Sequence, residues 1–447
     1  MATSGAWHNA NSSSSDPGAL PFTNGSEPLP SFESSVPAPA ARHDAMGPLH
    51  EPLFRSLWIA AVVSYTGTWM QNTGAAWLMT SLTMSPLMVG LVQAAGSIAV
   101  FLVVLPAGAL ADMADRRKLL LFTQSWMVLA AVALGALTIA GKITPSLLLL
   151  LTFLMGFGAV LNDPAWQAIT PEVVSPRNFA AGVAWNSAGY NVARAIGPAF
   201  GGLLIAAAGS GTAFLLNGVS FFGVIYFLLR WKQRPAQFTF KVSGMMGSMV
   251  EGMRHMRASQ SVKAVLVRSA LFSISASALP ALLPLLAHPF GSQGYGLLLG
   301  FFGVGALAGA AIMPFTRRHF STDTLVSVST ATFAFTTYAA PEWCTFALLS
   351  VTMFVAGVAW IQIIASLNVA AQTMCPNHMR ARAISMYLLV LQGGLAGGAA
   401  LWGGIAELAG TDRSLCYAAI GLLIGLPAAA YFRLRAGDME PSTAGMD

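Results

Sequence analysis

Twelve long apolar segments, separated by polar loops, constrain the fold of this chain more than any other feature. A bilayer core about 30 Å thick requires roughly 20 apolar residues for each helix that crosses it. The segments are apolar throughout rather than at alternate positions, which excludes an outer-membrane barrel. We therefore predict an all-α polytopic membrane protein with twelve transmembrane helices in two six-helix halves. The segments cover residues 57–80, 86–111, 119–140, 146–168, 180–208, 212–231, 265–288, 294–315, 324–340, 346–371, 382–408 and 414–433.

The composition agrees with a chain surrounded by lipid. Of its 447 residues, 55% are hydrophobic and 9% are charged, against about 25% charged residues in soluble domains. The net charge of +6 is spread over short loops and forms no basic patch, so no nucleic-acid partner is expected. Cys344, Cys375 and Cys416 lack metal-ligand spacing, and neither a metal nor a cofactor is expected. A disulfide between Cys344 and Cys416 stays open.

Polar stretches divide the chain into five regions. Residues 1–52 are rich in Ser, Pro, Ala and Gly, which predicts a disordered cytoplasmic tail. Residues 53–232 form the first six-helix half, and residues 263–436 form the second. Between them, residues 233–262 are a cytoplasmic linker whose methionines recur at helical spacing, as in a helix on the membrane surface. Residues 437–447 form a second cytoplasmic tail.

The basic residues predict the orientation, because Lys and Arg are held on the cytoplasmic side during insertion. With the amino terminus inside, 20 of the 23 Lys and Arg fall on inner segments. Lys142 and Arg413 fall outside, and Arg194 lies within a helix. Both termini are therefore predicted to be cytoplasmic.

The two halves share a pattern of loop residues, as transporter repeats often do. The matching residues lie about 200 positions apart in the chain. They are Pro176 with Pro376, Gly197 with Gly397, and Arg116 and Arg117 with Arg317 and Arg318. The halves therefore run in the same sense, related by an axis along the membrane normal.

These features resemble a known family. The pattern G-x-L-A-D-x-x-x-R-R, from Gly108 to Arg117, together with the parallel halves, resembles the major facilitator superfamily. Further motifs are similar to its transmembrane secretion effector branch, which includes the enterobactin exporter. They are G-T-W-M-Q at 67–71, L-T-x-S-P at 82–86 and A-R-x-x-G-P-A-x-G-G at 193–202.

The resemblance implies a conformational gate on the cytoplasmic side, formed by Gly108, Asp112, Arg116 and Arg117. In the family picture, Asp112 faces a helix end of the other half, and Arg116 pairs with a nearby carboxylate. Met113 stands where the superfamily usually has a basic residue, so the latch should be weaker than usual. The alternative is that the basic residues only set the topology.

Arg194 is the sharpest single signal, because a guanidinium within a membrane costs several kcal/mol. Asn186, Tyr190 and Arg194 follow at i, i+4 and i+8, with Asn191 beside them, so one helix face is polar and predicted to line a cavity. No acidic residue lies at matching depth, so an anionic substrate group would supply the counter-charge. The alternative is a structural Arg bonded to backbone carbonyls or to a partner helix.

Gly197, Pro198, Gly201 and Gly202 follow on the same helix. They thin the helix and remove a backbone hydrogen bond, which allows a close approach and a bend. In the family this pattern is similar to a motif associated with antiporters, and it implies export. The alternative is simple packing of small residues.

Asp163 is the one carboxylate inside a predicted span rather than in a loop or at a span's extreme end, and it precedes Pro164. It is a candidate proton carrier; the alternative is a helix-breaking polar cluster near the cytoplasmic mouth. Trp166 stands where the branch tends to have Arg. That departure removes a charge from this helix.

Uncharged polar and aromatic residues complete the predicted cavity. They are Tyr65, Trp69 and Asn72 in the first helix and Gln362 in the tenth. Such groups suit a bulky amphipathic ligand. Polar side chains also join membrane helices without contacting any substrate, and that alternative stays open.

The chain contains no phosphate-binding G-x-x-x-x-G-K-[ST] loop, no H-E-x-x-H and no G-x-S-x-G, so we expect no enzyme and an ion gradient as the driving force. By resemblance, we expect a secondary active exporter, proton-coupled, of a siderophore or similar small amphipathic compound. It would work in the bacterial inner membrane, with protons, substrate and the lipid bilayer as partners, as a monomer. The alternatives are a multidrug or lysophospholipid exporter and a non-transporting membrane receptor.

Overall fold

The computed structural model describes residues 46–113, 115–231, 260–342, 345–373, 380–432 and 434, with only the backbone described at 104–113. Most of the predicted amino-terminal tail, the linker and the carboxy-terminal tail lie outside the described residues, as do Cys344 and Cys375. The described part of the chain is helical, without strands. Its long helices are α2 (Pro52–Leu82), α3 (Pro86–Met113), α4 (Arg116–Ile139), α5 (Pro145–Val173), α6 (Phe179–Arg230), α8 (Gln260–Ala276), α10 (Gly291–His319), α11 (Thr322–Glu342), α12 (Phe346–Thr373), α13 (Arg380–Ala409) and α14 (Thr411–Tyr431). Shorter elements are α1 (Gly47–His50), η1 (Pro176–Asn178), α9 (Ala278–Leu286) and η2 (His288–Phe290).

Each predicted apolar segment coincides with a helix or with part of one. Helix α6 contains two predicted segments. They form two helical arms, 179–208 and 210–230, that join at the non-helical residue Gly209. The φ of Gly209 is 79°, a left-handed conformation that favours glycine. One further segment is built from α8 and α9 in succession. Fold class and helix arrangement therefore agree with the sequence prediction.

Eight described stretches are long and apolar enough to cross a membrane, and one of them, of 55 residues, contains both arms of α6. Helices α2, α11 and α14 complete the twelve. Helix α11 is rich in Ser and Thr, and Thr330 and Thr337 donate hydrogen bonds to carbonyls one turn back in the same helix. Such bonds satisfy the hydroxyls where water is absent.

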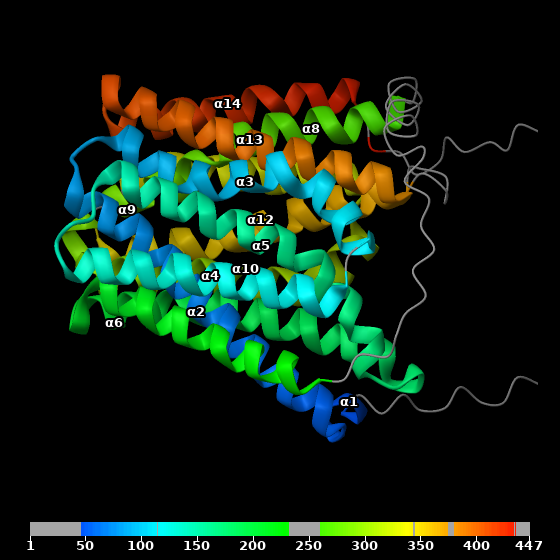
Figure 1. The fold of residues 1–447 in the computed structure, drawn as a ribbon. Coiled ribbons are helices and arrows are strands. Elements are labelled where there is room, and N and C mark those ends of the chain that lie inside the picture. Colours follow the sequence, from blue (N-terminus) through cyan, green and yellow to red (C-terminus); the bar gives the residue numbers. More distant parts are fainter. Residues whose placement is uncertain are drawn as a thin grey trace, which may run out of the picture. The chain divides into compact units, whose positions relative to one another are not determined.

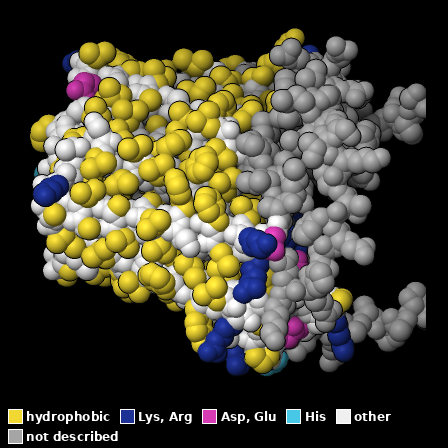
Figure 2. Space-filling view, in the orientation of Figure 1, with side chains coloured by type: hydrophobic (Ala, Val, Ile, Leu, Met, Phe, Trp, Pro, Cys, Tyr) yellow, Lys and Arg dark blue, Asp and Glu magenta, His cyan; other side chains and the backbone are white. Residues whose placement is uncertain are grey.

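The outer surface of the bundle is apolar. Leu129, Val219 and Phe315 are 70%, 60% and 62% exposed, values that soluble proteins avoid over contiguous areas. Figure 2 shows hydrophobic side chains across the middle of one face, with Lys and Arg toward its ends. This is the surface expected of helices that contact lipid.

Both arms of α6 pack on α2. Helices α2 and α6 lie in the lower part of Figure 1. Gly189 approaches Trp58 and Gly201 approaches Met70, so the first arm runs parallel to α2. The second arm runs the opposite way, because Gly223 faces Ala60 and Phe214 faces Gly74. Helix α2 therefore holds both arms.

The halves meet along two seams, one between α6 and α10 and the other between α3 and α13. In the first seam, a Cβ on Gly202 would lie 2.5 Å from the carbonyl oxygen of Ser292 and 2.8 Å from the Cα of Gly296. In the second, a Cβ on Gly90 would lie 2.6 Å from the carbonyl oxygen of Ala399. Backbones can approach this closely only where side chains are absent.

Two contacts join the halves at the end predicted to lie outside. The carboxylate of Glu407, on α13, accepts hydrogen bonds from Ser85 Oγ (2.6 Å) and from the backbone N–H of Leu87 (3.2 Å) at the start of α3. Nearby, the ring of Trp77 stacks against His288 (5.8 Å) and Tyr295 (6.0 Å). These contacts hold the two halves together at this end.

Toward the opposite end the first seam parts. The contacts of the first α6 arm with α10 run from Gly202 to Ala195, which lies against Gly303. Closer to the start of this arm, Tyr190 and Val183 are 43% and 44% exposed. The close backbone contacts between α6 and α10 therefore end near Ala195, and the start of this arm carries exposed side chains.

Gly202→Ala tests the first seam. The new methyl group has no room against the backbone of α10, so we expect a loss of about 1–3 kcal/mol of stability, as for overpacked cores. Gly397→Ala is the matched control, because a Cβ there meets nothing within 4 Å. Thermal unfolding of the purified variants in one detergent measures both. Equal melting temperatures for the two variants would contradict the close approach.

Candidate functional site

Four aromatic rings from three helices gather beside the first arm of α6. Tyr65 lies edge-on to Tyr190 (5.3 Å between centroids) and to Trp166 (6.5 Å), and Trp69 lies 6.2 Å from Tyr190. Two of these rings lie together because Tyr65 and Trp69 are one turn apart on α2 and share a face. We call Tyr65, Trp69, Trp166 and Tyr190 the aromatic cluster.

Arg194 extends from α6 over this cluster. Its guanidinium carbon lies 5.5 Å from the centroid of Trp69, a cation–π contact of about 0.5–2 kcal/mol. The guanidinium also interacts electrostatically with Tyr190. Arg194 is partly exposed and forms no hydrogen bond or ion pair with any residue that the structure describes. The structure does not contain the backbone bonds that a purely structural Arg would need.

Asp163 lies on α5 at the other side of Tyr190. Its carboxylate interacts electrostatically with the hydroxyls of Tyr65 and Tyr190. The side chain has an exposed surface although many protein atoms lie around it at longer range, so we infer that it faces a space inside the bundle. Within the described part of the chain, Asp163 has neither a hydrogen bond nor an ion pair. Two opposite charges thus both interact with Tyr190, and no ion pair joins them in the described part of the chain.

Arg268 provides a contrast within the same fold. Its guanidinium hydrogen-bonds the carboxylate of Asp323 and lies 3.3 Å from Ser327 Oγ, and Asp323 also accepts a hydrogen bond from the backbone of Leu434 (3.0 Å). The side chain of Arg268 is 6% exposed, so its charge is buried and neutralised. This arginine ties α8, α11 and the end of the described chain together.

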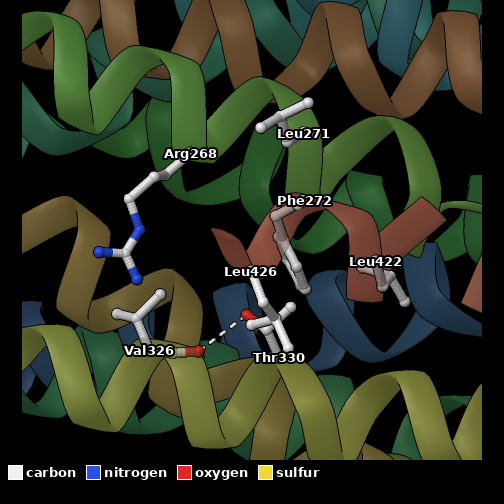
Figure 3. Close-up of a pocket in the computed structure, with 8 residues that line it drawn as sticks. Arg268, Leu271, Phe272, Val326, Thr330, Leu422 and Leu426 are labelled. Atoms are coloured by element: carbon white, nitrogen blue, oxygen red, sulfur yellow. Dashed lines mark hydrogen bonds between the residues drawn. The ribbon is translucent and has the colours of Figure 1, made fainter. Parts of the chain in front are cut away.

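A small pocket lies beside Arg268 (Figure 3). It has room for about one water molecule, at about 20 Å³. Apart from Arg268 and Thr330 its lining is apolar, with Phe272, Val326 and Leu422 among the residues, and Thr330 Oγ1 is turned to the carbonyl of Val326. The pocket is too small for an amphipathic substrate.

Asn186 and Asn191 lie on the arm of α6 that carries Arg194, but the structure gives both side chains local partners. Asn186 Nδ2 donates to Thr170 Oγ1 on α5 (3.1 Å), and Asn191 Nδ2 donates to the carbonyl of Ser187 (2.8 Å). Asn186 thus joins two helices. A substrate contact for either residue stays a prediction.

Gln362 and Asn72 have different surroundings. Gln362 is buried between α12 and α10, where it donates to the carbonyl of Gly309 (3.0 Å). Asn72 is exposed on α2, one turn from Trp69 and so on the side of the aromatic cluster. Of the two, Asn72 is the residue that the structure leaves accessible.

The glycine motif of α6 serves two neighbours. A Cβ on Gly197 would lie 2.6 Å from Trp69 Cβ, and one on Gly201 would lie 2.9 Å from Met70 Cα, so both glycines seat the arm on α2. Gly202 faces α10 instead. The backbone of α6 leaves helical geometry at Gly209 and not at Pro198, so the close approach is observed and a bend at Pro198 stays a prediction.

The predicted gate is described in part. Gly108 and Asp112 fall in α3, where the side chains lie outside the described residues. Arg116, the first residue of α4, forms an ion pair with Glu172 of α5 (2.6 Å). Arg117 donates to the carbonyls of Leu228 (2.6 Å) and Leu229 (2.7 Å) at the end of α6, where a cation favours the helix terminus. The latch across the halves remains a prediction.

A buried network behind Asp163 was not predicted from the sequence. Asn162 Oδ1 accepts hydrogen bonds from Thr123 Oγ1 and Gln124 Nε2, both at 3.1 Å, which fixes α5 against α4. The adjacent N-D pair in an apolar segment was the available signal, since successive residues on a helix face different sides. Asn162 faces the helix interface, and Asp163 faces the internal space.

The chain is similar to known proteins in sequence and in fold. A family model described as "Transmembrane secretion effector" matches residues 43–446. The chain belongs to the transmembrane secretion effector family. The family and its relatives are membrane transporters of the major facilitator type, not enzymes, which confirms both sequence predictions.

Curated relatives within this family are distant. The staphyloferrin A transporter of Staphylococcus aureus (strain NCTC 8325 / PS 47) is 23% identical over 254 residues, 56% of this chain and 64% of the relative. The enterobactin exporter EntS of Salmonella choleraesuis (strain SC-B67) is 25% identical over 382 residues, 83% of this chain and 90% of the relative. The chain therefore spans less than two thirds of the first relative.

Solved structures share the fold at lower identity. A bacterial homologue of the human lysosomal transporter Spinster, inward-facing and occupied, has a TM-score of 0.69 and 14% identity, covering 87% of this chain and 98% of that one. A bacterial homologue of the iron transporter ferroportin, also inward-facing, has a TM-score of 0.63 and 14% identity, covering 85% and 98%. Both similarities concern the fold alone.

Cysteine labelling tests the internal space at Asp163. With Cys344, Cys375 and Cys416 replaced by Ser, Asp163→Cys should react readily with a small, hydrophilic thiol reagent, because this position is open to water. Asn162→Cys is the matched control, since Asn162 is 7% exposed and faces α4. We expect labelling at least about tenfold slower at position 162, as reactivity follows exposure. Equal rates would disprove the internal space.

Proposed function

We propose that this membrane transporter is a secondary active exporter that exchanges protons for a siderophore or a similar small amphipathic compound. The observation that carries the proposal is the arrangement of Arg194 and Asp163, two unpaired charges beside the aromatic cluster within the membrane-spanning region. Intramembrane charges are expensive and usually mark substrate or ion pathways. An aromatic surface with few polar groups suits an amphipathic ligand.

The two charges have separate roles in this proposal. The guanidinium of Arg194 presents paired donors that match an anionic group of the substrate. Asp163 binds the coupling proton, because its carboxylate faces an enclosed space and has no cationic partner. Binding of one ligand then alters the charge that the other meets, which is the requirement for exchange.

The seams and the gate supply the motion. Glu407 and Trp77 join the halves at the end predicted to lie outside, so rocking about the glycine contacts would expose the cavity to each side in turn. In the opposite state, Gly108, Asp112, Arg116 and Arg117 would close the inner end. The glycine motif at Gly197, Pro198, Gly201 and Gly202 forms the surface on which the halves move.

The same proposal includes the cellular setting. The exporter lies in the bacterial inner membrane with both termini in the cytoplasm, in agreement with the distribution of Lys and Arg. It acts as a monomer, since one chain contributes both halves and the whole cavity. The names of the relatives, an enterobactin exporter and a staphyloferrin A transporter, support a siderophore as substrate.

Uptake of enterobactin and of staphyloferrin A into inverted membrane vesicles tests this proposal. We expect wild-type uptake of at least one compound, abolished by a protonophore. Arg194→Ala and Asp163→Asn should retain less than about a tenth of the rate, equivalent to a loss of at least 1.4 kcal/mol. Uptake that persists without the gradient would rule out antiport.

Matched variants control for loss of charge. Arg230 lies on the same helix and also stacks on a ring, that of Tyr226 (4.6 Å), but at the end of α6, away from the cluster. Asp412 is exposed at the start of α14. Arg230→Ala and Asp412→Asn should transport at near the wild-type rate. Wild-type transport by Arg194→Ala would remove Arg194 from the substrate site.

A further inference from the structure

Arg194 and Asp163 raise a question that an anionic substrate alone leaves unanswered. An anion bound at Arg194 would still leave a second, opposite charge facing the same internal space. We propose that the substrate is dipolar: it carries an anionic group that binds Arg194 and an ammonium-type group that binds Asp163, with an apolar or aromatic body between them. This inference rests on the proposed transport function and names the substrate class of that site.

Arg194 and Asp163 form no ion pair with any residue that the structure describes. Arg268 shows that this fold neutralises a buried guanidinium with a carboxylate where the charge is structural, since Asp323 binds it directly. Arg194 and Asp163 are given no such partner among the described residues, although they are near enough for both to interact with Tyr190. Each charge is therefore available to a different end of one ligand.

The positions of the rings in the aromatic cluster also support a dipolar ligand. Aromatic faces bind cations through the ring quadrupole, and a cage of Trp and Tyr with a carboxylate is a common site for ammonium groups. Asp163 has this environment, because it interacts with Tyr65 and Tyr190, and Tyr65 in turn contacts Trp166. At the other end, Trp69 already holds the guanidinium of Arg194. The rings thus complement both ends of a dipolar molecule.

A dipolar ligand would also explain how the substrate is exchanged for a proton. An ammonium group binds the ionised form of Asp163, whereas the coupling proton binds the same carboxylate and neutralises it. The two cations compete, so substrate binding releases the proton into the internal space without any covalent step. The titratable or charged groups that face Asp163 from α2 and α6 are Tyr65, Tyr190 and, beyond Tyr190, Arg194. One carboxylate can therefore serve both cargo and proton.

A matched set of fluorescent amphiphiles tests this inference by direct binding. Nα-dansyl-lysine carries a carboxylate on its α-carbon and an ammonium group at the far end of its four-carbon chain; dansylcadaverine lacks the carboxylate, and Nα-dansyl-norleucine lacks the ammonium. Binding to the full chain in lipid nanodiscs is measured by energy transfer from tryptophan to the dansyl group, and Trp69 and Trp166 are suitably placed donors. We expect dansyl-lysine to bind at least about tenfold more tightly than either analogue.

Variants assign each end of the ligand. Asp163→Asn should weaken dansyl-lysine to the affinity of dansyl-norleucine and leave that analogue unchanged. Arg194→Gln should weaken dansyl-lysine to the affinity of dansylcadaverine and leave that analogue unchanged. The unchanged analogue shows in each case that the variant is folded. Arg230→Gln and Asp412→Asn are controls and should bind all three probes as the wild type does.

Three results would overturn the inference: equal binding of dansyl-lysine and dansyl-norleucine, an unchanged affinity ratio in Asp163→Asn, or no binding of any probe. The assay uses no ion gradient, so a failure of proton coupling in vesicles would leave these ratios intact. Conversely, gradient-driven uptake of a siderophore together with equal probe affinities would reject the dipolar substrate and keep the exporter.

Discussion

The contact between the first arm of α6 and α2 is the interaction on which the site depends. Gly197 and Gly201 let the two backbones approach until a Cβ would clash with Trp69 or Met70. At that separation Arg194, one turn before Gly197, lies over the ring of Trp69, and Tyr190 meets Tyr65. One residue further, Gly202 turns the same arm onto α10 of the other half. Substrate site and moving seam therefore share a helix.

The charged side chains of this bundle are of two kinds, those with a partner in the protein and those without one among the described residues. Arg116 with Glu172 and Arg268 with Asp323 form ion pairs within a half, and Arg117 satisfies the carbonyls at a helix end. These residues hold helices together near the end that carries Met46 and Leu434. Arg194 and Asp163 are accessible to an internal space instead. Because an unpaired charge in a membrane has a large free-energy cost, its retention is best explained by a ligand that completes it.

Much of the fold was predictable because membrane helices are specified by a one-dimensional property, the length of apolar runs. The sequence also indicated that Tyr190 and Arg194 share a face, since that follows from helical periodicity. It could not indicate that Asp163 lies beside Tyr190, because this depends on how α5 packs against α2 and α6. The sequence interpretation named Asp163 as a candidate proton carrier, with a polar cluster near the cytoplasmic mouth as the alternative, and found no acid at the depth of Arg194.

Partners across helices were the other limit. Asn186 was assigned to the cavity by its spacing from Arg194, yet its amide bonds Thr170 on α5. Gln362 was assigned by residue type, and it lies buried against Gly309. Polar side chains in membrane helices serve both purposes, and only three-dimensional packing distinguishes them. The same holds for Glu407, whose bond to the start of α3 joins positions 322 residues apart.

An experimental structure of the protein with Nα-dansyl-lysine bound is the most direct test of the central claim, that Arg194 and Asp163 face one cavity and act on the same ligand. The account predicts the carboxylate of the ligand within hydrogen-bond distance of the Arg194 guanidinium and its ammonium beside Asp163, with Tyr190 between them. A ligand seated elsewhere, with Arg194 bonded to backbone carbonyls or to Asp163 itself, would contradict it.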